Sequence, residues 1–196
     1  HENGTTHWYY ANSKGEITIP TADGEVGVVK TIDGKSYLFN SDGEMVTGLR
    51  ILTYDGSKIT NISSEVDSAD TVKNMNSDTM KLVYFESNGA AKTGTTTITL
   101  DGTSYTFSFK SNGSPRGVGE TGISDGYIYQ NGLRLTADED TKYGVVTYKN
   151  ESYVVNEKGS IQKNKKNLKD ADETYYCTNA KGILLHSSTE KCTTKH

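Results

Sequence analysis

Aromatic side chains in short runs are the residues of this sequence best suited to molecular recognition. A polar turn and then a glycine follow each run, as in Tyr37-Leu38-Phe39 before Gly43. Aromatic faces can pack against sugar rings, and they attract cations. The alternative is that the rings form the core, since a thin repeat fold must bury its aromatic face. The candidate ligand-binding residues are Trp8, Tyr9, Tyr10, Tyr37, Phe39, Tyr84, Phe85, Tyr105 and Phe107.

Acidic residues gather at two places, Asp138-Glu139-Asp140 and the group Asp170, Asp172 and Glu173. Carboxylates can ligate Ca²⁺ or act as a catalytic pair in glycoside hydrolysis. Neither group has the glycine and the spacing of a Ca²⁺-binding loop, and spacing alone does not define a glycosidase pair. We therefore interpret both groups as solvated loops.

The C-terminal part contains Cys177, His186, Cys192 and His196, whose spacing loosely imitates a zinc finger. In a secreted protein two cysteines so close in sequence most simply form a disulfide. We rank a Cys177–Cys192 disulfide first, free thiols second and zinc last. No metal site and no cofactor are expected.

Catalytic signatures are missing from the sequence. It contains no P-loop, no G-x-S-x-G, no H-E-x-x-H and no Cys–His pair in a familiar catalytic context. We therefore expect a protein that is not an enzyme.

Composition favours several thin, aromatic-rich cores over one thick core. Only 33% of the 196 residues are hydrophobic, and that share already includes 13 Tyr, while 20 Gly and 2 Pro indicate tight turns. A net charge of −4 supplies no basic field for nucleic acid. No apolar stretch approaches the roughly 20 residues that span a bilayer, so we expect no membrane insertion. The start HENGTTHWYY, without Met, favours a secreted or cell-surface protein whose signal peptide has been removed.

One pattern repeats along the chain. The glycine turns read NSKG, NSDG, ESNG, KSNG, NEKG and NAKG, and tighter turns precede several aromatic runs at Asp33-Gly34, Asp101-Gly102 and Lys149-Asn150. Asp-Gly between extended runs is a strong hairpin signal. The predicted unit is therefore a strand, a tight turn, an aromatic strand and a glycine turn.

These units predict an all-β fold, an array of stacked β-hairpins similar to a β-solenoid. We predict a single repeat array over residues 1–196, with better repeats at 5–48 and 82–118 and a degenerate long-repeat region at 119–196. Residues 64–78 are polar and are expected to form one short helix or a loop insert.

The segment TIDGKSYLFNSDGEMVTG (31–48) resembles the cell-wall-binding repeat, also called the choline-binding repeat, of Gram-positive surface proteins. Related units are the glucan-binding repeats of streptococcal enzymes and the C-terminal repeats of clostridial toxins. The segments YFESNGAAKTG (84–94) and TITLDGTSYTFSFKSNG (97–113) continue the pattern.

The resemblance implies stacked β-hairpins that hold ligands between successive units, in an accessory region attached to an enzyme or adhesin. The family builds its choline sites largely from Trp, whereas this sequence has only Trp8. Leu49, Ser36 and Thr95 stand where the family usually carries Trp. Tyr-rich versions of the repeat fit sugar stacking or a structural role better.

The functional hypothesis is a non-catalytic cell-wall or glycan-binding repeat module that anchors a secreted bacterial protein. Its partners would be cell-wall polysaccharide, teichoic acid or exopolysaccharide, and weak sites repeated along the array would gain by avidity. The rival hypothesis is a structural spacer or adhesin stalk with no ligand of its own.

Overall fold

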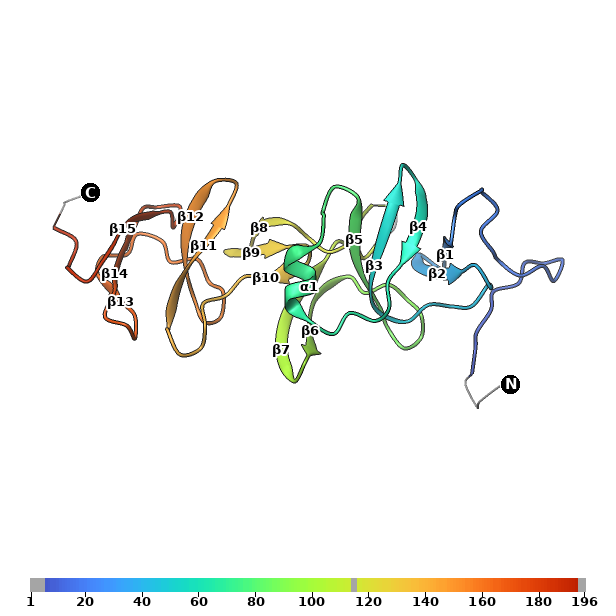
Figure 1. The fold of residues 1–196 in the computed structure, drawn as a ribbon, viewed down its shortest axis with the longest axis horizontal. Coiled ribbons are helices and arrows are strands. Elements are labelled where there is room, and N and C mark those ends of the chain that lie inside the picture. Colours follow the sequence, from blue (N-terminus) through green and yellow to red (C-terminus); the bar gives the residue numbers. More distant parts are fainter. Residues whose placement is uncertain (1–5, 114–115, 194–196) are drawn as a thin grey trace. The chain divides into compact units, whose positions relative to one another are not determined.

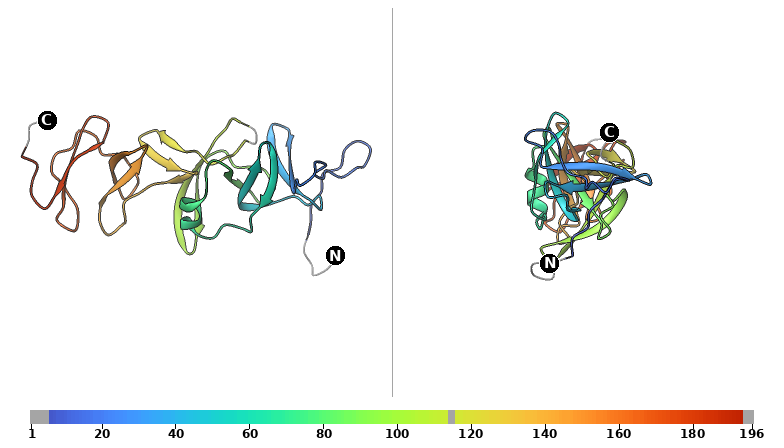
Figure 2. Two further views of the ribbon diagram at one scale, coloured as in Figure 1. Left: turned by 45° about the horizontal axis from the view of Figure 1, so that its top comes forward. Right: turned by 90° about the vertical axis from the view of Figure 1, so that its right-hand side faces the viewer.

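The computed structural model describes residues 6–113 and 116–193, which belong to two compact units. Unit 1 comprises His1–Glu120 and Asn131–Leu133, and unit 2 comprises Thr121–Gln130 and Arg134–His196. Both units consist of short β-hairpins (Figures 1 and 2). The predicted all-β hairpin fold is confirmed, whereas one continuous array over residues 1–196 stays a prediction.

Unit 1 contains seven strands and one helix. The strands β2, β1, β4, β3 and β5 form one antiparallel sheet in that order, and β6 pairs with β7 in a hairpin. The elements are β1 (Gly27–Ile32), β2 (Lys35–Asn40), β3 (Gly48–Asp55), β4 (Lys58–Ile62), α1 (Ala69–Asn74), β5 (Met80–Phe85), β6 (Gly94–Leu100) and β7 (Thr103–Phe109).

Unit 2 contains shorter hairpins. Strand β8 pairs with β9, β11 pairs with β12, and β13, β14 and β15 form a three-stranded sheet. The two-residue strand β10 contributes Leu133 to unit 1 and Arg134 to unit 2. The strands are β8 (Gly122–Ser124), β9 (Tyr127–Gln130), β10 (Leu133–Arg134), β11 (Tyr143–Tyr148), β12 (Glu151–Asn156), β13 (Leu168–Lys169), β14 (Tyr175–Thr178) and β15 (Leu184–Ser188).

The tight hairpin turns have the predicted chemistry. Asp33 and Gly34 join β1 to β2 with φ angles of 49° and 77°, and Lys149 and Asn150 join β11 to β12 with 49° and 63°. Two successive positive φ angles define the type I′ turn, whose twist matches that of paired strands. These two-residue turns therefore set the hairpin register.

The glycine turns form a second, recurrent motif. In five of the six predicted copies the glycine N–H donates to the carbonyl of the first turn residue, and the glycine φ lies between 79° and 85°. Glycine suits such left-handed backbone because it lacks a Cβ. The pairs are Gly15 and Asn12, Gly43 and Asn40, Gly89 and Glu86, Gly159 and Asn156, and Gly182 and Asn179.

A seventh turn of this kind escaped sequence analysis because it has no glycine. At Asp170 the side-chain Oδ1 accepts the N–H groups of Asp172 and Thr174, as Asn40 Oδ1 accepts those of Asp42 and Glu44. Glu173 takes the place of the glycine with φ 66°. The acidic group at 170–173 is thus a structural turn.

The predicted insert at 64–78 contains the short helix α1. Ser68 caps it by accepting the N–H of Asp70 at 3.2 Å, and Val72 is fully buried against unit 1. No helix among the described residues is long and apolar enough to cross a membrane.

The core is divided into several thin clusters, as composition predicted. The two larger clusters lie in unit 1, one around Phe107 and Phe109 and one around Phe85 and Leu38. A third cluster in unit 2 surrounds Ile128 and includes residues of β12. Cys177 and Cys192 form a disulfide within unit 2.

Candidate functional site

An aromatic groove of about 390 Å³ lies in unit 1. It combines the N-terminal segment 8–10 with strand β2 and the turn between β5 and β6. Its lining residues are Trp8, Tyr9, Tyr10, Ile32, Tyr37, Phe39, Met45, Ser87 and Asn88.

Strand alternation places two of these rings. Tyr37 and Phe39 are two residues apart on β2, so their side chains leave the same face of the strand. Phe39 is almost fully buried at 2% exposure and forms the floor, while its ring lies 6.2 Å from that of Tyr10. The floor is therefore rigid core, and Tyr37 is only partly covered.

Backbone pairing fixes the N-terminal segment over this floor. The N–H of Met45 donates to the carbonyl of Trp8 at 2.8 Å, and the N–H of Thr18 donates to the carbonyl of Tyr10 at 2.8 Å. The segment before the first glycine turn is therefore hydrogen-bonded to the residue that follows the second glycine turn, Met45. Trp8 is 66% exposed and Tyr9 is 50% exposed, so aromatic faces stay open to solvent.

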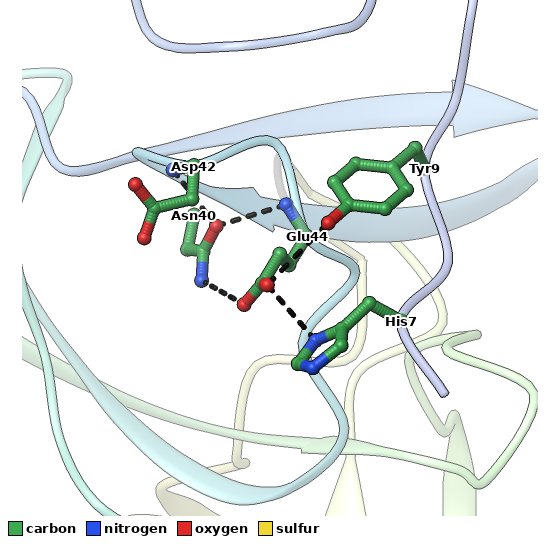
Figure 3. Close-up of polar contacts among 5 residues, drawn as sticks. All are labelled: His7, Tyr9, Asn40, Asp42 and Glu44. Atoms are coloured by element: carbon green, nitrogen blue, oxygen red, sulfur yellow. Dashed lines mark hydrogen bonds and ion pairs between the residues drawn. The ribbon is translucent and has the colours of Figure 1, made fainter. Parts of the chain in front are cut away.

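The carboxylate of Glu44 holds the same segment from the side (Figure 3). Its Oε1 lies 2.9 Å from His7 Nδ1 and accepts a long hydrogen bond of 3.5 Å from the Tyr9 hydroxyl. Its Oε2 accepts a hydrogen bond of 3.3 Å from Asn40 Nδ2. Asn40 itself is held by the N–H groups of Asp42 and Glu44 in the glycine turn. The glycine turn therefore positions the Glu44 carboxylate, and this carboxylate in turn holds His7 and Tyr9.

The nine predicted site residues divide into two groups. Trp8, Tyr9, Tyr10, Tyr37 and Phe39 come together in the groove. The other four belong to the core: Phe85 and Phe107 are fully buried, and Tyr84 and Tyr105 pack against the cluster around Phe107.

Sequence analysis missed the non-aromatic half of the groove. Met45, Ser87 and Asn88 line it, and Glu44 and His7 support it. A signal was present for Met45 and Glu44, since both directly follow the glycine of the second turn. His7 carried no signal, because its partner Glu44 is distant in sequence.

A second aromatic pair, in unit 2, is covered by an arginine of the same chain. The guanidinium of Arg134 lies 3.7 Å from the centre of the Tyr127 ring and donates to the Tyr129 hydroxyl at 2.8 Å. The guanidinium covers one face of the Tyr127 ring, lies 5.5 Å from the centre of the Tyr129 ring and engages the Tyr129 hydroxyl. Unlike the groove of unit 1, this pair presents no free aromatic face on that side.

The remaining candidate chemistry has structural explanations. Residues 138–140 are exposed and lie in the loop between β10 and β11. Among the described residues no group of three or more His, Cys, Asp or Glu side chains could hold a metal ion, and His196 of the zinc alternative lies outside them.

Comparison with known proteins identifies the fold. No family model matches the sequence, and no curated protein matches it either. Among solved structures, choline-binding protein F from Streptococcus pneumoniae, crystallised in the presence of a peptidoglycan analogue, matches with a TM-score of 0.51 and 22% identity. CbpJ from Streptococcus pneumoniae TIGR4 matches with a TM-score of 0.52 and 19% identity.

These matches cover 92% and 93% of this chain but only 44% and 64% of the two relatives, so the chain spans less than two thirds of either. The chain therefore has the fold of the choline-binding repeat proteins, and the predicted resemblance to that repeat is confirmed at the level of fold.

Proposed function

We propose that this chain is a non-catalytic cell-wall-binding module that holds a glycan in the aromatic groove of unit 1. This proposal rests on one observation: five aromatic side chains line one groove, and one of them, Trp8, is 66% exposed. Contiguous exposed apolar surface on a soluble protein marks interaction sites. Anchoring of a larger secreted protein would follow from this binding.

The groove lining favours a neutral ligand. Among the described residues that line it, none carries a charged side chain, and Ser87 and Asn88 offer hydroxyl and amide groups. Aromatic faces with a few polar groups suit a sugar ring, whose hydroxyls need hydrogen-bond partners and whose C–H face packs on rings. We therefore place cell-wall polysaccharide or exopolysaccharide ahead of teichoic acid, whose phosphates are charged.

Two further observations support a cell-surface role. The Cys177–Cys192 disulfide is a bond that persists in oxidising, extracellular compartments. Choline-binding protein F, which has the same fold, was crystallised in the presence of a tetrasaccharide-pentapeptide analogue of peptidoglycan.

The rival role of a spacer or stalk is favoured by the other aromatic residues. Phe85 and Phe107 are core, and Arg134 covers Tyr127 and Tyr129. A spacer without a ligand does not require the exposed ring of Trp8. The groove is therefore the feature that distinguishes a binding module from a spacer.

The deciding experiment is retention of the chain on purified Gram-positive cell walls, with free choline and soluble glucan as separate competitors. Release by glucan alone would support sugar binding. Release by choline alone would show that the ligand is a quaternary ammonium group and not a sugar. Tyr37→Ala should weaken retention about tenfold, since one lost stacking face costs about 1–1.5 kcal/mol.

The matched control is Tyr143→Ala on β11, which removes a partly exposed tyrosine outside the groove and should leave retention unchanged. Absence of retention on every wall tested would refute the binding function and leave the spacer role.

A further inference from the structure

Unit 2 contains a pocket of about 360 Å³ whose chemistry differs from that of the aromatic groove. Its walls come from the segment before β13, from β14 and the turn that follows it, and from β15. Two of its lining residues are lysines and none is acidic, so the pocket favours a negatively charged ligand. The lining residues are Asn164, Lys165, Lys166, Cys177, Thr178, Asn179, Ala180 and Leu185.

The lysines that line the pocket lack counter-charges within the chain. The stretch 162–169 reads QKNKKNLK, with four lysines and no acidic residue. The last of these, Lys169, pairs with Glu173 at 2.7 Å. Among the described residues, no carboxylate lies within ion-pair distance of Lys165 or Lys166. Both ammonium groups are therefore available to an anion from solution.

Backbone hydrogen bonds hold the lysine segment against β14 and the turn after it. The N–H of Thr178 donates to the Lys165 carbonyl at 2.9 Å. The N–H of Asn164 donates to the Asn179 carbonyl at 2.8 Å. The pocket wall also includes Cys177, which the disulfide fixes to Cys192. The two walls are therefore ordered before a ligand arrives, which lowers the entropic cost of binding.

Two uncharged polar side chains of the pocket can act only as donors. Thr178 is 5% exposed, and its Oγ1 already accepts the N–H of Lys165 at 3.1 Å. Asn179 Oδ1 already accepts the N–H groups of Lys181 and Ile183 at 2.9 Å and 3.0 Å. The Thr178 hydroxyl proton and the Asn179 Nδ2 group have no acceptor among the described residues. Both side chains therefore offer a ligand the hydrogen-bond donation that an anion requires.

We propose that this pocket binds the phosphate groups of a phosphodiester polymer. A phosphodiester carries two anionic and two ester oxygens around one phosphorus, so it can accept from donors on both walls of the pocket. Lysine binds phosphate as a point charge, and Ala180 and Leu185 offer apolar surface for the carbon chain between phosphates. The site is separate from the aromatic groove, and only the choice of a cell-wall polymer as the source of the phosphates rests on the proposed function.

The test is an NMR titration of the whole chain with poly(glycerol phosphate) as the probe. We expect saturable amide shifts at 164–166 and 178–180, and an affinity that falls as salt is added, because the lysines are exposed. Inorganic phosphate should compete with the polymer for the same amides. Polygalacturonate, whose charges are carboxylates, should bind several-fold more weakly, because a planar carboxylate reaches fewer of the donors.

Asn179→Asp is the decisive variant. The turn keeps its side-chain hydrogen bonds, because Asp170 Oδ1 makes the same contacts in the turn at 170–174. The change replaces a donor of the pocket by a negative charge, so the affinity for poly(glycerol phosphate) should fall about tenfold or more. The matched control is Asn156→Asp, which makes the same change in a turn of the same kind that does not line the pocket. It should bind the polymer like the wild type.

Lys166→Gln tests the pocket without a change in any turn. Lys166 is exposed, so its replacement should preserve the fold, and the loss of one ammonium group should weaken binding of the polymer several-fold. The control is Lys158→Gln, which removes an exposed lysine of unit 2 that does not line the pocket. Its affinity should match that of the wild type.

Any of four results would overturn the proposal: no saturable shift with poly(glycerol phosphate), binding of inorganic phosphate but not of the polymer, equally tight binding of polygalacturonate, or equal affinities of the two Asp variants. The aromatic groove is tested separately, because soluble glucan should change the fluorescence of Trp8 in every variant alike if the proposed function is correct. A failure of the phosphate pocket therefore leaves the glycan-binding function standing.

Discussion

Glu44 Oε1 lies 2.9 Å from His7 Nδ1, which ties a residue of the second glycine turn to the segment that carries Trp8. The two residues are far apart in sequence, and the hydrogen bond from Met45 N–H to the Trp8 carbonyl brings their segments side by side. The aromatic groove therefore depends on a polar contact that lies beside it and does not line it.

Loss of this contact should loosen the groove. We expect Glu44→Ala to make Trp8 more accessible to acrylamide quenching and to weaken cell-wall retention several-fold, because His7, Tyr9 and Asn40 lose their common acceptor. Trp8 is the single Trp of the sequence, so its fluorescence reports this site alone. The change in stability should stay below about 1 kcal/mol, because the contacts of Glu44 lie at the surface.

Glu173→Ala is the control, since it removes an exposed carboxylate that pairs with Lys169 in unit 2. Equal quenching in the Glu44 variant and the wild type would show that Glu44 does not hold the segment.

The two groups of aromatic residues should differ in their contribution to stability. Phe107→Ala should destabilise unit 1 by about 3–5 kcal/mol, because it empties a fully buried site. Trp8→Ala should change the free energy of unfolding by only about 0.5 kcal/mol, because the ring is mostly exposed. Urea unfolding followed by circular dichroism measures both. A large decrease in the free energy of unfolding of Trp8→Ala would show that Trp8 contributes to the core.

The disulfide should stabilise the C-terminal sheet. Cys177 and Cys192 close a loop with a sequence separation of 15. In the chain-entropy description such a loop contributes about 3 kcal/mol. Reduction should therefore lower the melting temperature of unit 2 and expose the amides of β14 and β15 to hydrogen exchange. Amides of β6 and β7 in unit 1 serve as the internal control, and their early exchange would show that the bond acts on the whole chain.

Stability should fall at alkaline pH. Burial raises the pKa of Tyr54 to about 12, and burial together with a hydrogen bond to Asp170 raises the pKa of Tyr176 to about 12, from an ordinary value of 10.0. Below pH 10 both phenols are neutral in the folded and unfolded chain. Between pH 10 and 12 the unfolded chain releases these protons first, so the free energy of unfolding decreases over that range.

Tyr54→Phe isolates one of these contributions. The Tyr54 hydroxyl is buried and has no hydrogen-bond partner among the described residues, so its removal should not destabilise the chain at neutral pH. The variant should lose less stability than the wild type between pH 10 and 12. Identical pH profiles from urea unfolding would show that Tyr54 ionises without opening the fold.

Local features of the fold were predictable from the sequence. Asp33-Gly34 predicted a type I′ hairpin because few residues accept two positive φ angles, and NSDG predicted a turn that closes at Gly43. Side chains alternate along an extended strand, so residues two apart, such as Tyr37 and Phe39 on β2 or Phe107 and Phe109 on β7, share a face. All of these depend on residues that are close in sequence.

Only the tertiary structure decided which aromatic runs form a groove and which form the core. Tyr37-Leu38-Phe39 and Val83-Tyr84-Phe85 look alike in sequence, but the segment at 8–10 leaves a gap over the first run, whereas Phe109 and its neighbours cover Tyr84. Burial depends on what packs on a face from elsewhere in the chain. The same reason explains why sequence alone does not reveal the role of Glu44.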